Sequence, residues 1–461
     1  MHRVFKALHI HAKDYPNDIA FDDGTRQVSF QDLNAEVQQL ASALPNDIQT
    51  IAIVLPNSVD YVVADLALSL AGKTVVPIPH FFSSEQIAYL CQTAKVEASI
   101  GVQLPGLPLL STDNTTASKS LSYRDHERII FTSGSSGHPK GVRHGEAQMA
   151  AMIDALANVT NPTMDDIYLS VLPQPQLLEQ FCGIYLPIIF ACKVVIAPKA
   201  TEVLFGGDLH NFARAYETHK PTLTLWVPQL LKLALANITQ NPSMRWPSHL
   251  RFAALGGAKC DIGLLQKAQE IGLPVYEGYG LSECCSVVAI NRTASNRMGS
   301  VGQIIKSVNV SIDNGEIVIK GPTVMKGYAS SAPHEGAWRT GDLGHIEDGY
   351  LYIDGRKDNL ILMPSGRNIS PEWIESKCEL VAGVKGSALC LVEGQLVLLI
   401  LAEARFELVA IEQALSTLPG YAKPRQIVLI VNPEQNFMRP TGTPNRALAQ
   451  AVAEDLQKED I

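Results

Sequence analysis

Short apolar runs alternate with amphipathic helical patterns over about the first 300 residues, and this alternation restricts the fold more than any other feature. Ile51–Leu55 is a continuous apolar run, typical of a parallel strand that is buried on both faces. Ser29 can cap a helix, because Asp32 follows three residues later and apolar residues then recur on one helical face. Further strands are expected at Thr74–Val76, Val96–Ile100, Ile167–Val171, Val194–Ala197, Thr222–Trp226 and Phe252–Leu255, with helices at Val59–Leu70 and Glu85–Thr93. The pattern predicts an α/β fold with doubly wound sheets.

The pattern changes after about residue 300, where turn signals separate short strands. Asp313-Asn314-Gly315 and Asp348-Gly349 are typical of hairpins. The strands around them, expected at Val308–Ile312, Glu316–Lys320, His345–Glu347 and Tyr350–Ile353, predict a small antiparallel sheet or barrel that completes a large N-terminal domain, residues 1–355. Residues 102–125, rich in Gly, Pro, Ser and Thr, are expected to form a loop between subdomains.

Residues 356–461 are expected to form a smaller, mobile C-terminal α+β domain. Its strands are predicted at Leu389–Val392 and Gln395–Leu401, around a Glu393-Gly394 turn, and a helix is predicted at Glu407–Leu418.

Composition and charge exclude some classes of protein. Hydrophobic residues make up 46% and charged residues 18% of the chain, as in ordinary globular proteins. A net charge of -9 argues against a nucleic-acid partner. The eight cysteines contain no C-x-x-C pair, which favours buried thiols in a reducing compartment. We find no signal segment and no bilayer-spanning run, so a cytoplasmic protein without integral membrane association is expected.

The segment Phe131–Val142 follows the end of an apolar strand and combines three glycines, four hydroxyl side chains and one lysine. Glycines allow the backbone to approach an anion, and N–H groups and hydroxyls can donate to phosphate oxygens. Lys140 adds a mobile positive charge. The spacing is not that of a Walker A motif, so a different kind of phosphate-binding loop is predicted.

Further landmarks follow in a fixed order: Gly278–Glu283 (Gly-Tyr-Gly-Leu-Ser-Glu), Gly299–Gly302 with Gly321–Tyr328, Trp338–Leu343 and Gly355–Asp358. They resemble the motifs of the adenylate-forming (AMP-binding) superfamily, which contains acyl-CoA synthetases, luciferases and the adenylation domains of peptide synthetases. The landmarks cover about residues 15 to 446. The resemblance implies that the chain activates a small carboxylic acid with ATP and Mg²⁺.

The resemblance also implies an ATP site. Residues that correspond to the loop on the β- and γ-phosphates are Thr132, Ser133, Gly134, Ser135, Ser136, Gly137 and Lys140. Tyr279, followed by Gly280, corresponds to the ring that stacks on adenine, opposite the backbone of Gly256, Gly257 and Ala258. Ser282 takes the place of the usual threonine, and Asp342 corresponds to the carboxylate that accepts both ribose hydroxyls.

Four charged residues are implied to be catalytic. Attack of a carboxylate on the α-phosphorus brings anions together, so the site needs cations and Mg²⁺. Lys140 corresponds to a cation on the phosphates, Arg356 to an arginine near the ribose and phosphates, and Glu283 to the glutamate that holds Mg²⁺. Asp358 corresponds to the hinge between the adenylate-forming and thioester-forming poses. The loop Met363–Pro371 resembles the segment that enters the site in the thioester-forming pose. Its sequence is most similar to that of long-chain fatty-acyl members.

Acyl specificity is expected near Leu172–Gln180. Amino-acid-activating relatives carry an acidic residue near the start of this segment, where this chain has uncharged Gln174 and Gln176. The expected acyl pocket consists of Gln174, Leu177, Leu178, Phe181 and Gly278. The substrate is therefore expected to be a fatty or other apolar acid and not an amino acid.

One position departs from the family pattern. The C-terminal signature of the family contains Pro-x-x-Gly-Lys, and its lysine bridges the substrate carboxylate and the α-phosphate, but here Thr443 takes that place. Either Arg439 or Arg446 substitutes, or the chain is a degenerate nucleotide- or acyl-adenylate-binding protein with weak or no adenylation. In the first case the expected reaction forms acyl-AMP and transfers the acyl group to a thiol. Coenzyme A and the phosphopantetheine of an acyl or peptidyl carrier protein both remain open as acceptors.

Overall fold

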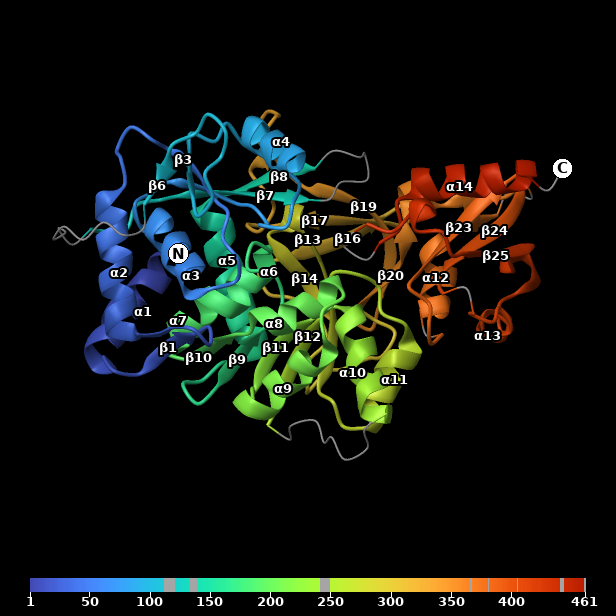
Figure 1. Ribbon diagram of the computed structural model, residues 1–461, viewed down its shortest axis with the longest axis horizontal. Helices are drawn as coiled ribbons and strands as arrows, with labels where there is room; N and C mark the ends of the chain where they lie inside the picture. Colours follow the sequence, from blue (N-terminus) through green and yellow to red (C-terminus); the bar gives the residue numbers. More distant parts are fainter. Residues whose placement is uncertain are drawn as a thin grey trace.

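The computed structural model describes residues 1–111, 121–132, 139–240, 249–364, 367–379, 381–403, 405–439 and 443–459. Figure 1 shows the first two helices, α1 (His2–Asp14) and α2 (Phe30–Ala43), at one end of the long axis and the C-terminal strands and helices at the other. Ser29 caps α2 as predicted, since its Oγ accepts a hydrogen bond from the Asp32 N–H at 3.1 Å. Helix α1 was not predicted.

A large sheet runs through the N-terminal domain. Its parallel part contains β13 (Val275–Leu281), β12 (Phe252–Leu255), β11 (Leu223–Trp226), β9 (Ile167–Ser170), β10 (Lys193–Ile196) and β1 (Ile19–Asp22), with β2 (Gln27–Ser29) antiparallel at the edge. Its antiparallel part continues from β13 through β14 (Ser286–Ile290), β15 (Gln303–Ile304), β20 (Tyr350–Arg356), β19 (Trp338–Glu347), β17 (Glu316–Lys320) and β16 (Asn309–Asp313). The predicted antiparallel strands are confirmed, and β13 joins them to the parallel strands.

The hairpin turns follow the predicted chemistry. Asn314 and Gly315 have φ angles of 51° and 79°, and Asp348 and Gly349 have 49° and 82°. Positive φ at both central residues is the condition for the turn that matches the twist of paired strands.

A second sheet has the order β18 (Gly327–Tyr328), β8 (Lys140–His144), β7 (Glu127–Thr132), β4 (Thr74–Pro77), β3 (Thr50–Ile53), β5 (Ala98–Ile100) and β6 (Leu109–Leu110). Because β5, β6 and β7 all belong to this sheet, the expectation that residues 102–125 form a loop between subdomains is wrong. The reason is that Leu109–Leu110 pairs with β5, a contact that a Gly/Pro-rich composition does not reveal.

Helices cover both sheets, as predicted (Figure 1). They are α3 (Val59–Leu70), α4 (Ser84–Ala94), α5 (Glu146–Thr160), α6 (Leu177–Gln180), α7 (Leu186–Phe190), α8 (Pro198–Thr201), α9 (Leu209–His219), α10 (Pro228–Gln240) and α11 (Ile262–Glu270), with a π-helical segment at Phe181–Tyr185. Helix α3 is buried along nearly its whole length, and its Asp65 forms an ion pair with Arg128 of β7 at 2.6 Å. Both side chains are fully buried, so this pair fixes α3 against the second sheet.

The smaller C-terminal domain contains β23 (Gly386–Val392), β24 (Gln395–Leu401) and β25 (Gln426–Ile430), with α12 (Pro371–Glu379), α13 (Val409–Ala414) and α14 (Arg446–Glu459). A short hairpin, β21 (Ile361–Leu362) with β22 (Asn368–Ile369), precedes it. Its apolar clusters are separate from the core of the large domain. Helix α13 is shorter than predicted. The domain boundary near residue 355 and the mobility of this domain stay predictions.

The described residues contain no disulfide bond, and most of the cysteine side chains are buried. Within the same residues, no helix has both the length and the apolar character needed to cross a membrane.

Candidate active site

The candidate site lies at the carboxyl ends of β12 and β13, where open α/β sheets commonly bind ligands. Gly256–Ala258 follow β12 directly, and Gly278–Glu283 form the end of β13 and the turn after it. Gly280 is required here, because an added Cβ would lie 1.6 Å from the Ser286 carbonyl oxygen of β14. Close approach of two backbones therefore explains this motif glycine.

Tyr279, Asp342 and Arg356 meet beside this strand end. Strands β19 and β20 place Asp342 directly opposite Arg356, and the Arg356 Nη1 lies 3.2 Å from the Asp342 Oδ1. The Tyr279 hydroxyl donates to the Asp342 Oδ2. Burial raises the pKa of Asp342, while Tyr279 and Arg356 oppose that shift. A carboxylate has about four acceptor positions, so Asp342 can accept further hydroxyl donors.

Lys140, Tyr328 and Glu283 form a second group. The Tyr328 hydroxyl donates to the Glu283 Oε1 at 2.9 Å, and the Lys140 Nζ lies 5.4 Å from the centroid of the Tyr328 ring. Ser282 and Glu283 occupy the same short 3₁₀ turn after β13. The structure thus brings together a lysine, a tyrosine and a glutamate that are far apart in the sequence. Tyr328 ends the Gly321–Tyr328 landmark, but the sequence did not predict it as a site residue.

The predicted phosphate loop is described only at its ends. Thr132 is the last residue of β7 and pairs with Lys140, the first residue of β8. Ser133, Gly134, Ser135, Ser136 and Gly137 lie outside the described residues.

The donor set fits Mg²⁺ bound together with a nucleotide. Among the described residues, no cluster of three or more His, Cys, Asp or Glu side chains could hold a metal ion. Mg²⁺ is usually bound through one or two carboxylates plus substrate phosphates and water. Glu283 offers one such carboxylate, and its role in holding Mg²⁺ stays a prediction.

The predicted acyl-pocket residues lie mainly in the interior. Gln174 is buried, and its Oε1 accepts a hydrogen bond from the Ser58 N–H at 2.8 Å. Leu177 and Phe181 are buried in the main core, whereas Leu178 is partly exposed. Gly278 lies in β13, where an added Cβ would come within 3.1 Å of the Ala289 carbonyl oxygen. Their role in acyl binding stays a prediction.

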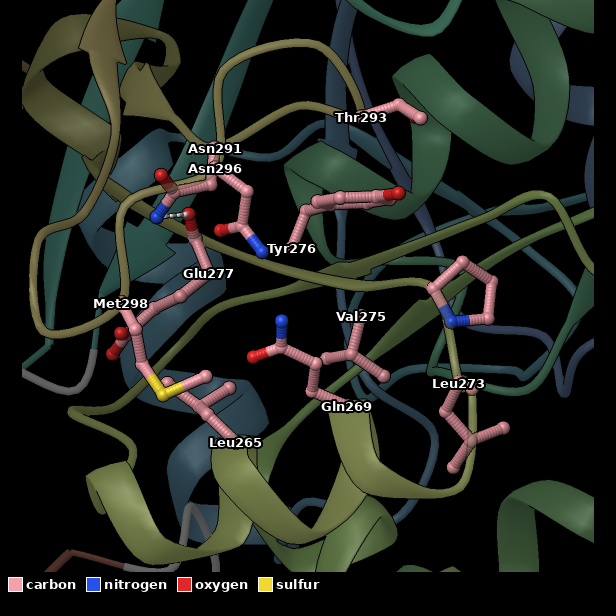
Figure 2. Close-up of a pocket in the computed structure, with 12 residues that line it drawn as sticks. Leu265, Gln269, Leu273, Val275, Tyr276, Glu277, Asn291, Thr293, Asn296 and Met298 are labelled. Atoms are coloured by element: carbon pink, nitrogen blue, oxygen red, sulfur yellow. Dashed lines mark hydrogen bonds between the residues drawn. The ribbon is translucent and has the colours of Figure 1, made fainter.

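A separate cavity of about 330 Å³ lies between α11, β13 and the loop after β14. Figure 2 shows the carboxamides of Gln269 and Asn296 turned toward each other across it. Glu277 lines one side and accepts a hydrogen bond from the Cys260 N–H at 3.0 Å, and burial raises its pKa to about 7. No sequence motif indicated this cavity, and it contains none of the predicted nucleotide residues.

The predicted hinge residue Asp358 and the C-terminal tail have distinct surroundings. Asp358 is exposed, and its Oδ2 lies 3.9 Å from the Arg356 Nη2. Arg446 forms ion pairs with Glu375 and, at 3.2 Å, with Glu372. The Arg439 N–H donates to the Thr443 carbonyl oxygen at 2.9 Å. Of the two arginines proposed to replace the missing lysine, Arg446 is therefore held inside the C-terminal domain.

Comparison with known proteins adds a family match. The family model described as AMP-binding enzyme matches residues 8–329. A curated relative, 2-succinylbenzoate–CoA ligase of Bacillus velezensis, is 31% identical over 57% of this chain and 56% of its own length. The match therefore spans little more than half of the first curated relatives.

Solved structures share the fold over nearly the whole chain. The anthranilate CoA ligase AuaEII in complex with anthranoyl-AMP has a TM-score of 0.84 at 19% identity, with 99% of this chain and 98% of that chain covered. The O-succinylbenzoate CoA synthetase MenE of Bacillus subtilis, in complex with ATP and a magnesium ion, has a TM-score of 0.82 at 21% identity, with 96% and 98% covered.

Proposed function

Because the chain belongs to the AMP-binding enzyme family, we propose that it activates a carboxylic acid with ATP to an acyl-adenylate and transfers the acyl group to the thiol of coenzyme A. The observation that carries this proposal is the convergence of two groups at the end of β13: Tyr279 with Asp342 and Arg356, and Glu283 with Tyr328 and Lys140.

Each group has a separate task. The Asp342 carboxylate accepts the ribose hydroxyls, and the Tyr279 ring and the Gly256–Ala258 backbone enclose the adenine. Lys140 and the loop before it bind the β- and γ-phosphates, and Arg356 lies near the ribose and phosphates. Glu283 would hold Mg²⁺, which supplies charge neutralisation for the phosphates when it is bound.

In the reaction, a substrate carboxylate oxygen forms a bond to the α-phosphorus while the bond to pyrophosphate breaks. The residues of this chain orient the two anions and offset their repulsion. In the second step the thiol attacks the acyl carbon and AMP leaves. Movement of the small domain about Asp358 would separate the two steps.

An aromatic or otherwise apolar acid is the proposed substrate class. Gln174 and Gln176 offer no negative charge for an ammonium group. The named relatives act on 2-succinylbenzoate and anthranilate. Their substrates favour an aryl acid over the long-chain fatty acid that the sequence of the Met363–Pro371 loop suggested. Because these relatives are CoA ligases, coenzyme A is preferred to a carrier protein as acceptor.

ATP–pyrophosphate exchange against a panel of acids tests the proposal. The panel contains 2-succinylbenzoate, benzoate, anthranilate, octanoate, palmitate and phenylalanine. We expect exchange with at least one aryl or alkyl acid and none with phenylalanine. Exchange with the amino acid alone would contradict the proposed substrate class.

A second candidate function follows from Thr443. With a threonine in the place of the family lysine and with Arg446 held by two carboxylates, the chain would be a nucleotide- or acyl-adenylate-binding protein with little turnover. Tight AMP binding by calorimetry without exchange for any acid would favour this second function.

A further inference from the structure

Tyr328 lies where the second sheet meets the candidate site. Its strand β18 pairs with β8, so that Tyr328 is opposite Val142. Its hydroxyl reaches the Glu283 Oε1 at 2.9 Å, and its ring faces the Lys140 Nζ at 5.4 Å from the centroid. One side chain therefore contacts a carboxylate from the turn after β13 and a cation from β8 of the second sheet.

The backbone around Tyr328 is fastened on both sides. The Met325 N–H donates to the Glu283 carbonyl oxygen at 2.8 Å, and the Ala329 N–H donates to the Gly141 carbonyl oxygen at 2.7 Å. The Trp338 ring packs edge-on against the Tyr328 ring, with centroids 6.0 Å apart. The phenol is thus held in place by contacts other than those to Glu283 and Lys140.

Resting on the function proposed above, we propose that Tyr328 is a positioning residue that orients the Glu283 carboxylate for Mg²⁺ and holds Lys140 for the terminal phosphates of ATP. The Tyr328 hydroxyl is the donor in its hydrogen bond to the Glu283 Oε1. The hydrogen bond restricts Glu283 but leaves other acceptor positions of the carboxylate.

The ring also offers Lys140 a contact that does not neutralise it. A cation above an aromatic face keeps its full charge. If Lys140 paired directly with Glu283, the metal-binding charge and the phosphate-binding charge would cancel each other.

Tyr328→Phe tests the hydroxyl alone, because it keeps the ring. Calorimetry would compare ATP binding with and without Mg²⁺, and AMP binding, in the wild type and the variant. We expect unchanged AMP affinity and unchanged ATP affinity without Mg²⁺. The gain in ATP affinity on adding Mg²⁺ should fall roughly tenfold, the effect of losing one hydrogen bond to a charged group.

Tyr328→Leu additionally removes the ring. ATP binding without Mg²⁺ should then weaken roughly threefold, as expected for a lost cation–π contact, whereas AMP binding stays unchanged because AMP lacks the terminal phosphates. Tyr350→Leu is the matched control, because the Tyr350 ring also lies beneath a cation, Arg297 at 4.3 Å, but belongs to the hairpin at the other end of β20. This control should bind as the wild type does.

Two results would overturn the inference while leaving the proposed function intact. One is a wild-type response to Mg²⁺ in Tyr328→Phe. The other is an equal loss of AMP and ATP affinity together with a lower melting temperature, which would indicate a purely structural role. A wild-type protein that binds neither nucleotide would overturn the proposed function itself, and with it the role of Tyr328.

Discussion

Arg446 and Glu375 form an ion pair that joins the first residue of α14 to α12 inside the C-terminal domain. The Glu375 side chain is 6% exposed and also accepts a hydrogen bond from the Leu389 N–H at 2.7 Å. Glu372 contacts the same guanidinium. A cation held by two carboxylates has little charge left for a phosphate, so Arg439 is the better candidate to replace the missing lysine.

Arg446→Met should therefore destabilise the protein. Removing one partner of a buried pair leaves the Glu375 charge uncompensated, and we expect a loss of about 3 kcal/mol in the free energy of unfolding of the C-terminal domain. Urea denaturation measures it, with Arg439→Met as a control that should unfold as the wild type does. Full stability of Arg446→Met combined with lost pyrophosphate exchange would mean that Arg446 is catalytic after all.

Thr443→Lys should raise the rate of adenylation. One preorganised donor or cation at a reacting phosphate contributes on the order of 10²–10³ in rate. Single-turnover formation of acyl-AMP measures the gain, and consumption of presupplied acyl-AMP by the thiol should change little. If the lysine brings no gain and Arg439→Ala retains exchange, the tail is not the displaced lysine segment.

Asp342→Ala should weaken nucleotide binding by about 1.5–3 kcal/mol, the range for hydrogen bonds to a charged group. Titration calorimetry with AMP provides the measurement. Asp354→Ala is a matched control, since that carboxylate is exposed and contacts His345. Equal AMP affinity in the two variants would remove Asp342 from the ribose site.

Glu179 should make stability depend on pH. Burial raises the pKa of this carboxyl group to about 8, and the Tyr168 hydroxyl lies at 2.9 Å from its Oε2. The folded state therefore keeps a proton that the unfolded state releases near pH 4.3, and stability falls as pH rises from there toward 8, by up to about 1.4 kcal/mol per pH unit.

Glu179→Gln should lose this part of the pH dependence, whereas exposed Glu217→Gln should keep it. Denaturant unfolding between pH 5 and pH 8 gives both slopes. Parallel slopes for the wild type and Glu179→Gln would show that Glu179 is ionised in the folded protein.

Local sequence determined the features that depend on neighbouring residues. Ser29 caps α2 because its partner Asp32 is three residues away. The pairs Asn314-Gly315 and Asp348-Gly349 turn their hairpins because these residues tolerate positive φ. The apolar runs form the strands of the parallel sheets, and the order of the motifs is enough to identify the family without any tertiary contact.

Tertiary structure alone decided the contacts between distant residues. Tyr328 contacts Glu283, which is 45 positions away in the sequence, and Arg446 contacts Glu375, which is 71 positions away. No local sequence pattern could therefore assign a role to Tyr328, or show that Arg446 is a poor replacement for the missing lysine. The same holds for Leu109–Leu110, whose place in the second sheet depends on its pairing with β5. Hydrogen bonds and ion pairs depend on distance and burial in space, and these are set only when separate elements pack together.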